Sequence, residues 1–419
     1  MSFRPLSKPE LEKFGEEMYD LLRELFPICR SITGNGVRKT LKVLQERLPI
    51  NITEVPSGTQ VFDWTVPNEW NISDAYILDP DGKKIVDFQE SNLHVLGYSE
   101  PVDAKVHLDE LKKHLHSLPD MPDAIPYLTS YYKRQWGFCL KHRDLASLKD
   151  GTYTVKIDST LKPGSLTIGE CLLPGKQENE ILLSCYTCHP SSANDCLSGM
   201  ALAAMLGKLL SRVERRFTYR IIFIPETIGA ITYLSLNKER MMSKTHAGLV
   251  LSFVGDSGPF RYKKSRRGDA EIDRAVEHVM SSRLKKFRTV DFYPHLGSDE
   301  RQYCSPGFDL PVGLLTRTPY LEYPEYHTSL DNLSFVSGKN LAESLSLVYE
   351  IISALEMNRS YINQVMFCEP KLSQRNLCST LGSQKVFDAE RANFQWILNY
   401  SDGNHDLLDI AEKIPMPIV

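Results

Sequence analysis

The sequence lacks a long apolar segment. Its longest uninterrupted apolar runs, such as residues 248–254, are far shorter than the roughly 20 residues that a membrane-spanning helix needs. The N-terminus has no apolar stretch followed by a small-residue cleavage site, which a secretory signal would have. These absences predict a cytoplasmic protein that does not enter a membrane.

An excess of basic residues is also absent. The 49 Lys and Arg are outnumbered by 53 Asp and Glu, which gives a net charge of −4 and a pI near 6.3. This balance gives no general attraction to nucleic acid or to an anionic membrane. The nine cysteines are an odd number scattered along the chain, unlike a dense disulfide framework. We therefore expect most of them to be reduced, buried thiols.

The composition is that of a globular protein, with 42% hydrophobic and 24% charged residues. A chain of 419 residues predicts two or three domains. Helical spacing from about residue 9 to 48 indicates two opening helices. A mostly β segment follows, with a helical stretch near 107–118 and a hairpin-like pair of strands around residues 162–164.

After residue 175, four short apolar runs alternate with helical patterns, which predicts a parallel α/β sheet closed by a long helix over 338–357. The remaining tail has two short helical patterns broken at residues 402–404, the outline of a helix-turn-helix. From Gln364 onward it holds five Lys or Arg and seven Asp or Glu. Because a nucleic-acid reader is expected to be basic, this tail favours protein interaction or packing over nucleic-acid binding.

Loops that follow the predicted parallel strands contain residues suited to binding a metal. Ligands bind beyond the carboxyl ends of such strands, and these loops hold His189, Asp195, Glu226 and His327. Two imidazoles and one carboxylate suit a zinc ion that keeps an open position. We therefore expect His189, Asp195 and His327 to bind zinc, with Glu226 as the base that takes a proton from water.

Two other interpretations of residues 185–189 are possible. The Cys-x-x-Cys-His pattern matches a c-type haem attachment site. We reject it because that chemistry normally follows export and the motif directly continues an apolar strand. A Cys-x-x-Cys redox pair would need to open a helix, whereas Pro190 places the helix start near Ser198. We interpret Cys185 as a buried packing residue.

Four motifs in the same order resemble the successive signatures of zinc-dependent aminopeptidases and their exopeptidase superfamily. They are residues 193–199 (ANDCLSG), 226–229 (ETIG), 297–299 (GSD) and 326–331 (YHTSLD). The whole chain resembles bacterial aminopeptidase-like proteins with an inserted β-rich domain and a C-terminal winged helix. This resemblance implies an α/β fold with a mostly parallel peptidase core between helices. It implies N-terminal core helices over 1–52, an inserted β-rich domain over 53–170, the α/β core over 171–360 and a winged-helix-like domain over 361–419.

The resemblance also implies roles for individual residues. Asp195 matches the aspartate that bridges two metal ions, His327 the last histidine ligand and Glu226 the general base. The chain departs from the family pattern where Thr227 and Ser252 replace two carboxylate ligands, and His189 matches by position rather than by motif. We therefore expect one zinc ion per chain, held by His189, Asp195 and His327.

Four further residues are candidates for binding the substrate. Arg266, or its neighbour Arg267, could hold a substrate carboxylate. Asp299 and Arg301 follow Gly297 and Ser298 in a motif that lines the active site in relatives, so they could contact the substrate. Tyr326 could donate its hydroxyl to a developing oxyanion.

The favoured function is zinc-dependent hydrolysis of an amide bond in a small peptide or amino-acid conjugate, with aminopeptidase-like or carboxypeptidase-like specificity. A non-catalytic binding or scaffolding module is the first alternative. Deacylation of a sugar or natural-product intermediate is the second. Self-association into a homo-oligomer is compatible with each of them.

Overall fold

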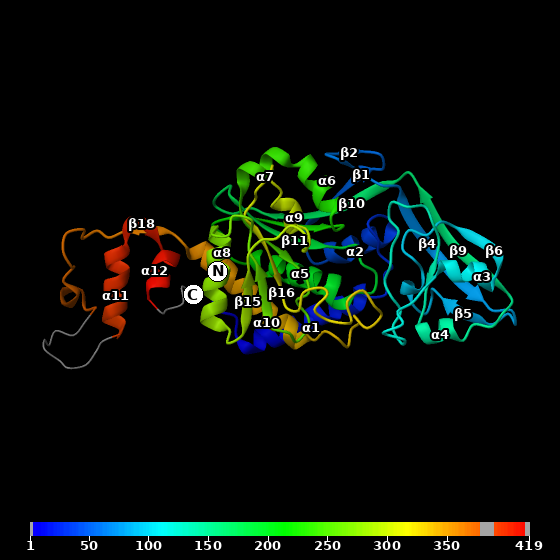
Figure 1. The fold of residues 1–419 in the computed structure, drawn as a ribbon. Helices are drawn as coiled ribbons and strands as arrows, with labels where there is room; N and C mark the ends of the chain where they lie inside the picture. Colours follow the sequence, from blue (N-terminus) through cyan, green and yellow to red (C-terminus); the bar gives the residue numbers. More distant parts are fainter. Residues whose placement is uncertain (1–2, 378–388, 415–419) are drawn as a thin grey trace.

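The computed structural model describes residues 3–377 and 389–414. Figure 1 shows three bodies in a row: a central α/β core, a β-rich body on one side and a small C-terminal body on the other. The α/β class, the mostly parallel core sheet between helices and the inserted β-rich body agree with the fold class predicted from the sequence.

The core is built on an eight-stranded sheet with the order β1-β10-β12-β11-β13-β16-β14-β15. Its four central strands, β12, β11, β13 and β16, are parallel, and they correspond to the four apolar runs of the sequence. Every residue of β11, β12 and β16 is buried, as expected for strands covered on both faces. The strands span Ile50–Pro56 (β1), Ser165–Leu173 (β10), Glu180–Tyr186 (β11), Thr218–Ile224 (β12), Thr245–Leu251 (β13), Phe260–Lys263 (β14), Phe287–Val290 (β15) and Val312–Thr316 (β16).

Helices cover this sheet in two groups. In one group α1 and α5 pack against α10, which also contacts α8; in the other, α6 contacts α7 and α9. The crossing of α1 and α10 is very close, because a Cβ on Gly15 would lie 2.3 Å from the carbonyl oxygen of Gly338. The core helices are Lys8–Leu25 (α1), Asn35–Gln45 (α2), Ser198–Leu210 (α5), Ile228–Leu236 (α6), Lys238–Lys244 (α7), Glu271–Arg283 (α8), Glu300–Tyr303 (α9) and Gly338–Met357 (α10).

The β-rich body contains a four-stranded antiparallel sheet with the order β5-β4-β9-β6. The alternating segments on either side of residues 162–164 do not pair with each other, contrary to the expected hairpin. β9 lies in this small sheet, whereas β10 pairs with β1 and β12 in the core sheet. The Pro163-Gly164 turn thus carries the chain from one sheet to the other, and the core sheet includes β1 and β10 although most of their residues fall within 53–170.

Short elements complete the β-rich body. The expected helix near 107–118 is reduced to one α-helical turn, α3, and a 3-10 turn. The elements are Gln60–Val61 (β2), Trp64–Thr65 (β3), Glu69–Leu78 (β4), Lys84–Asp87 (β5), Asn92–His94 (η1), Val102–His107 (β6), Leu108–Leu111 (α3), Lys112–His114 (η2), Leu115–His116 (β7), Phe138–Cys139 (β8), His142–Ala146 (α4) and Thr152–Lys162 (β9).

The C-terminal body joins the core through α8. Arg274 on that helix contacts Asp406 through two hydrogen bonds of 2.9 Å each and Asp409 at 2.8 Å. The elements of the C-terminal body are Ser360–Ile362 (β17), Leu372–Arg375 (η4), Ala389–Tyr400 (α11), Asp402–Asp406 (β18) and Leu407–Lys413 (α12). Across the described residues of the whole chain, no helix is both long and apolar enough to cross a membrane.

Candidate metal centre

Three loops meet at the carboxyl edge of the central strands. His189 and Asp195 follow β11, Glu226 follows β12, and His327 lies between β16 and α10. One ligand atom from each of His189, Asp195 and His327 lies within 4.8 Å of the other two. The Oδ2 atom of Asp195 is 3.1 Å from Nε2 of His327 and 3.9 Å from Nε2 of His189. The structure therefore brings the three predicted ligands together.

The backbone around Asp195 is held by a second buried carboxylate. Residues 193–197 form one wide π-type turn that leads into α5, and such turns are frequent at functional sites. The side chain of Asp331 accepts the amide protons of Asn194 at 2.7 Å and of Asp195 at 3.0 Å. Because Asp331 lies only four residues after His327, it couples the loop of His327 to the loop that carries His189 and Asp195, and these two loops supply all three ligands.

The two histidines are fixed through their backbone carbonyls. The buried Arg30 donates from Nε to the carbonyl oxygen of His189 at 3.0 Å. His327 has a left-handed backbone with φ of 52°, and its carbonyl accepts the amide proton of Tyr127 at 2.7 Å. These contacts hold the backbone from which each imidazole extends.

The ligand atoms fit a zinc ion. Oδ2 of Asp195 and Nε2 of His327 are buried and have no hydrogen-bond partner within the described part of the chain. Burying such atoms is costly unless an ion or another polar group binds them. Tetrahedral ligands at the usual zinc bond lengths of about 2.0 Å lie about 3.3 Å apart, close to the 3.1 and 3.9 Å separations observed here.

Burial also sets the protonation that a metal ligand needs. It lowers the pKa of His189 to about 4, so this imidazole is neutral near pH 7. For Asp195 burial alone raises the pKa, but the neighbouring imidazoles of His189 and His327 hold it below its usual value. The centre thus presents two imidazoles and one carboxylate anion, which is a typical ligand set for catalytic zinc.

The two carboxylate oxygens of Asp195 differ. Oδ1 accepts a hydrogen bond from the hydroxyl of Tyr186, which also contacts the hydroxyl of Ser252 at 2.5 Å. Ser252 in turn donates to the backbone carbonyl of Asp195. Only Oδ2 is left facing the histidines. The sequence identified Ser252 as a replaced ligand but gave no sign that Tyr186 would contact it.

Glu226 lies beside this centre. Its Oε2 is 3.9 Å from Nε2 of His189, and its Oε1 accepts the hydroxyl proton of Ser298 at 2.6 Å. Burial raises the pKa of Glu226 to about 7, while the hydrogen bond from Ser298 acts in the opposite direction. A carboxylate with a pKa near 7 is well placed to accept a proton and release it again at neutral pH.

Asp299 and Arg301 lie behind Glu226. Asp299 is fully buried, and its Oδ1 accepts the amide proton of Thr227 at 2.7 Å. This bond supports the unusual backbone of Thr227, whose φ is 61°. Arg301 is half-buried and donates from Nε to the carbonyl of Ser298 at 3.1 Å. Asp299 therefore positions the loop after β12, while Arg301 contacts the backbone of Ser298, whose hydroxyl donates to Glu226.

The other two substrate candidates differ in their distance from the centre. Tyr326 stacks on His327, with ring centroids 3.9 Å apart. Arg266 and Arg267 both contact Asp309, at 2.8 and 3.4 Å. In the described part of the chain, no contact joins Arg266 to a metal ligand or to Glu226.

The cysteines of residues 185–189 have packing roles. Cys185 is buried, and its thiol contacts the carbonyl of Ile222. Burial raises the pKa of Cys188 well above its usual value, and its sulfur accepts the amide proton of Glu226 at 3.3 Å. A neutral, buried thiol is neither a good metal ligand nor a reactive nucleophile.

An aromatic residue of the β-rich body completes the centre. The ring of Tyr127 meets the imidazoles of His189 and His327 edge to face, at 5.3 and 4.9 Å. Its hydroxyl lies 3.0 Å from that of Tyr131. The sequence analysis missed Tyr127, because no short motif marks it and only the tertiary fold brings residues 125–129 beside 327–329.

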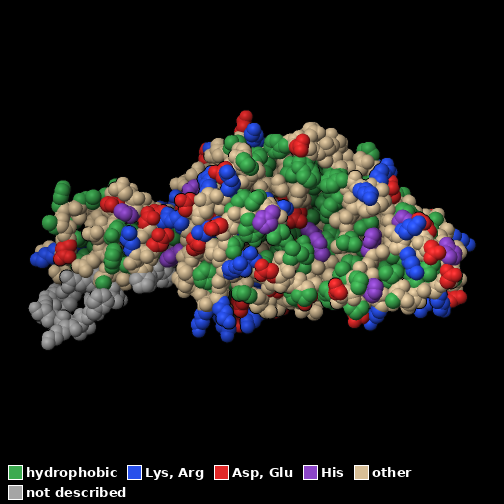
Figure 2. Space-filling view, in the orientation of Figure 1, with side chains coloured by type: hydrophobic (Ala, Val, Ile, Leu, Met, Phe, Trp, Pro, Cys, Tyr) green, Lys and Arg blue, Asp and Glu red, His purple; other side chains and the backbone are tan. Residues whose placement is uncertain are grey.

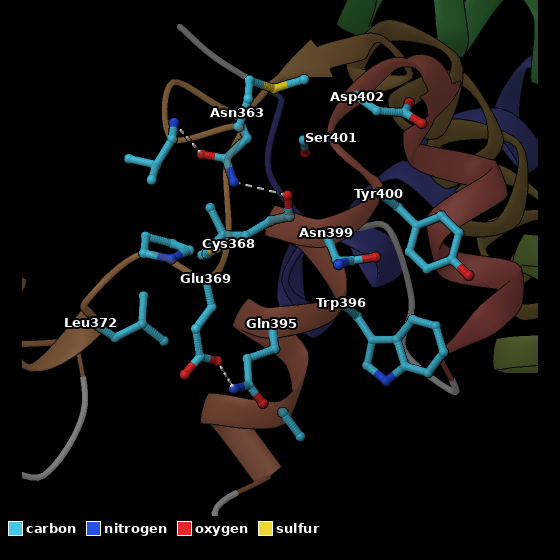
Figure 3. Close-up of a pocket in the computed structure, with 15 residues that line it drawn as sticks. Asn363, Cys368, Glu369, Leu372, Gln395, Trp396, Asn399, Tyr400, Ser401 and Asp402 are labelled. Carbon is cyan, nitrogen blue, oxygen red and sulfur yellow. Dashed lines mark hydrogen bonds between the residues drawn. The ribbon is translucent and has the colours of Figure 1, made fainter.

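Two hollows are prominent. Figure 2 shows the surface hollowed between the core and the β-rich body, with hydrophobic, acidic, basic and histidine atoms exposed along it. A separate cavity of about 790 Å³ lies in the C-terminal body (Figure 3), between residues 363–372 and α11. Trp396 and Tyr400 line this cavity. Gln395 and Glu369 also line it, and the side-chain amide of Gln395 donates to the carboxylate of Glu369 at 3.0 Å. The predicted site residues do not line this second cavity.

Comparison with known proteins identifies the two parts of the chain. The model of a family described as a domain of unknown function (DUF4910) matches residues 19–358, and that of a winged helix-turn-helix family matches residues 359–419. A Clostridium acetobutylicum protein is 50% identical over 402 residues, which cover 96% of this chain and 92% of the relative. That relative is named "Putative polysaccharide biosynthesis protein with aminopeptidase-like domain".

Solved structures show the same fold. A crystal structure of a "putative peptidase" from Clostridium acetobutylicum is 48% identical, with a TM-score of 0.92 and coverage of 97% of this chain and 93% of that one. A zinc aminopeptidase from Bacillus subtilis is 12% identical, with a TM-score of 0.58 and coverage of 81% and 94%. The resemblance to the zinc-dependent aminopeptidase superfamily is therefore confirmed at the level of fold, and the winged helix-turn-helix match confirms the expected C-terminal domain.

Proposed function

This chain belongs to the family described as a domain of unknown function (DUF4910), and from that premise we propose that it is a zinc-dependent hydrolase of amide bonds. Its substrates are small peptides or amino-acid conjugates. The aminopeptidase-like fold supports a peptidase-like hydrolase. The choice of zinc and of an amide substrate rests on the residues of the metal centre.

One observation carries this proposal: three metal-binding side chains converge with a base beside them. His189, Asp195 and His327 place their ligand atoms within 4.8 Å of one another, and Glu226 lies 3.9 Å from His189. His189 and Asp195 are buried. The cluster of ligands is therefore not a chance group of charged side chains on the surface. A structural zinc site would normally have four protein ligands, whereas three leave a position open for chemistry.

The residues supply the remaining chemistry. A zinc ion bound there would polarise the substrate carbonyl and acidify water. Glu226 takes a proton from the attacking water as the new bond from water oxygen to the acyl carbon forms. Glu226 then gives the proton to the leaving nitrogen as the carbon–nitrogen bond breaks, so the products are a carboxylic acid and an amine. Ser298 holds the carboxylate of Glu226 in place through its hydrogen bond.

We further propose one zinc ion per chain. The Tyr186 hydroxyl occupies Oδ1 of Asp195 and links it to Ser252. Oδ1 is therefore committed to a protein hydrogen bond, and Thr227 and Ser252 stand where the sequence comparison expected two more carboxylate ligands. Oδ2 alone remains for binding a cation.

A second candidate reaction uses the same centre. The name of the Clostridium acetobutylicum relative mentions polysaccharide biosynthesis, which favours removal of an acyl group from an amino sugar. The bond cleaved would again be an amide, and only the groups that flank it would differ.

We place the reaction in the cytoplasm. The eight cysteines of the described residues are all free thiols, as expected for a reducing compartment.

Metal content and turnover test the proposal together. Protein purified without chelator is expected to contain one zinc ion per chain by elemental analysis and to release amine from a panel of small amides. His327→Ala removes a ligand and is expected to lose the metal. Glu226→Gln keeps the ligands, so it is expected to retain zinc while hydrolysis falls by at least about 100-fold.

Two results would contradict this proposal. Wild-type protein that holds no zinc, and takes up none on dialysis against zinc, would favour the non-catalytic binding module. Retention of stoichiometric zinc by His327→Ala would refute the ligand assignment.

A further inference from the structure

Arg301 is a cation without an ionic partner beside the proposed base. It lies on α9, and its Nε donates to the carbonyl of Ser298, whose hydroxyl donates to Glu226. Among the described residues, no carboxylate forms an ion pair with Arg301.

Neighbouring charges near this loop are already paired. Lys263 contacts Glu300 at 2.8 Å in the protein interior, and Arg261 forms an ion pair with Glu322. Arg266 contacts Asp309. Arg301 thus differs from its neighbours, since its terminal nitrogens make no hydrogen bond within the described chain and remain available to an anion.

The position of Arg301 indicates which part of a substrate it would meet. Glu226 has to reach the leaving nitrogen in order to return the proton. In an N-acylated amino acid, the carboxylate is attached one carbon beyond that nitrogen. A guanidinium linked to Glu226 through a single serine would meet a substrate group on that same, amine side of the scissile bond.

Aromatic rings continue from the metal centre toward this loop. Tyr326 stacks on His327, and Tyr320 follows with its ring centroid 5.8 Å from that of Tyr326. Tyr320 also lies beside this loop, since its hydroxyl contacts the backbone of Gly297. These rings offer an apolar surface between His327 and the loop of Gly297, suited to an apolar or aromatic side chain.

We infer that Arg301 binds the free carboxylate of the leaving amino acid, so that the substrates are N-acylated amino acids or peptides cleaved at their last bond. This inference rests on the proposed amide hydrolysis and selects its carboxypeptidase-like form. A guanidinium can hold a carboxylate through two parallel hydrogen bonds, which lysine cannot reproduce.

A matched pair of substrates tests the inference. The pair is benzyloxycarbonyl-Gly-Phe with a free carboxylate and the same compound ending in a primary amide. Phenylalanine p-nitroanilide serves as the probe for aminopeptidase activity. Zinc-loaded wild-type protein is expected to cleave the carboxylate with a kcat/KM at least about tenfold above that of the amide.

Variants of Arg301 isolate the contact. Arg301→Gln is expected to raise KM for the carboxylate substrate by about 10- to 100-fold and to remove the preference over the amide. Arg301→Lys is expected to recover only part of that preference. Any effect on the pKa of Glu226 applies to both substrates and cancels in their ratio. The control is Arg212→Gln, an exposed arginine that follows α5 at the opposite edge of the sheet.

A binding measurement separates this inference from the proposed function. 3-Phenylpropionate carries the ring and carboxylate without an amide, so its calorimetric affinity does not depend on turnover. Weaker binding to Arg301→Gln by about tenfold or more would support the contact even if no amide were cleaved. Equal binding to both proteins, no preference for the carboxylate substrate, or preferential cleavage of phenylalanine p-nitroanilide would overturn it.

Discussion

At the scale of single residues, the centre depends on which polar atoms are paired and which are left for a ligand. Tyr186 occupies one oxygen of Asp195, while the other faces two imidazoles without a hydrogen-bond donor. Glu226 has one oxygen held by Ser298, and its other oxygen lies near His189. Each carboxylate is thus held by one oxygen and presents the other to the site.

The pKa of Glu226 gives a prediction for the pH dependence of activity. A general base has to be deprotonated, so kcat/KM is expected to fall as the pH drops through about 7 rather than through the usual range of a glutamate. Ser298→Ala removes a hydrogen bond that stabilises the carboxylate, and it is therefore expected to move this acid limb to higher pH. A pH–rate profile measured between pH 5 and 9 checks the shift. An unchanged limb in the variant would show that Ser298 does not tune the base.

At the scale of elements, the loop of the β-rich body and the loop that carries His327 behave as one unit. The amide of Tyr127 donates to the carbonyl of His327, and the amide of Ser329 donates to the carbonyl of Ile125. The Ser329 hydroxyl accepts the amide proton of Ile125 at 3.0 Å. The inserted segment is therefore a structural part of the metal centre and supports the loop that carries His327.

Truncation of Tyr127 tests this support. Tyr127→Ala removes the ring that meets both imidazoles, so zinc affinity is expected to fall by about 10- to 100-fold, as for other groups that orient metal ligands. Competition with a chelating dye measures the affinity directly. Tyr127→Phe is the matched control, because it keeps the ring and loses only the hydroxyl. The support would be refuted if the alanine variant bound zinc as tightly as the wild type.

At the scale of the whole molecule, the C-terminal body is attached at a distance from the chemistry. Arg274 on α8 binds Asp406 and Asp409, and Asn358 also contacts Asp406 at 3.0 Å. Leu408 is fully buried at the same junction. The winged helix-turn-helix match identifies the type of domain. A role in protein contacts rather than in reading nucleic acid stays a prediction from its acidic composition.

Breaking this junction is expected to loosen the domain without affecting catalysis. Arg274→Ala should increase the rate of limited proteolysis near residue 359 by roughly tenfold, equivalent to about 1.4 kcal/mol. Zinc content and hydrolysis should remain those of the wild type. A loss of zinc on this substitution would contradict the view that the attachment of the C-terminal body is independent of the metal centre.

The same junction has a defined pH dependence. Burial by itself raises the pKa of Asp406, but its hydrogen bonds with Arg274 and Asn358 lower the pKa to about 2. A lowered folded-state pKa contributes stability above the unfolded value near 3.9 that is lost as the pH falls toward 2. The attachment is therefore expected to persist throughout the neutral range, which proteolysis at pH 5 and pH 8 can check.

Much of the fold could be predicted from the order of its patterns. Apolar runs that alternate with helical patterns identified β11, β12, β13 and β16, and the spacing over 338–357 identified α10. The connection at residues 162–164 was predicted wrongly as a hairpin. Alternation of apolar and polar residues indicates a strand, but it does not say which sheet the strand joins.

Sequence by itself determined the chemistry available at the carboxyl ends of the strands. His189, Asp195, Glu226 and His327 follow predicted strands, and parallel strands end at the same edge. Only the tertiary structure decided which atoms of these residues face one another and which neighbours hold them. Tyr127, Tyr186 and Arg301 take their significance from contacts between distant segments, and such contacts depend on packing in three dimensions rather than on spacing along the chain.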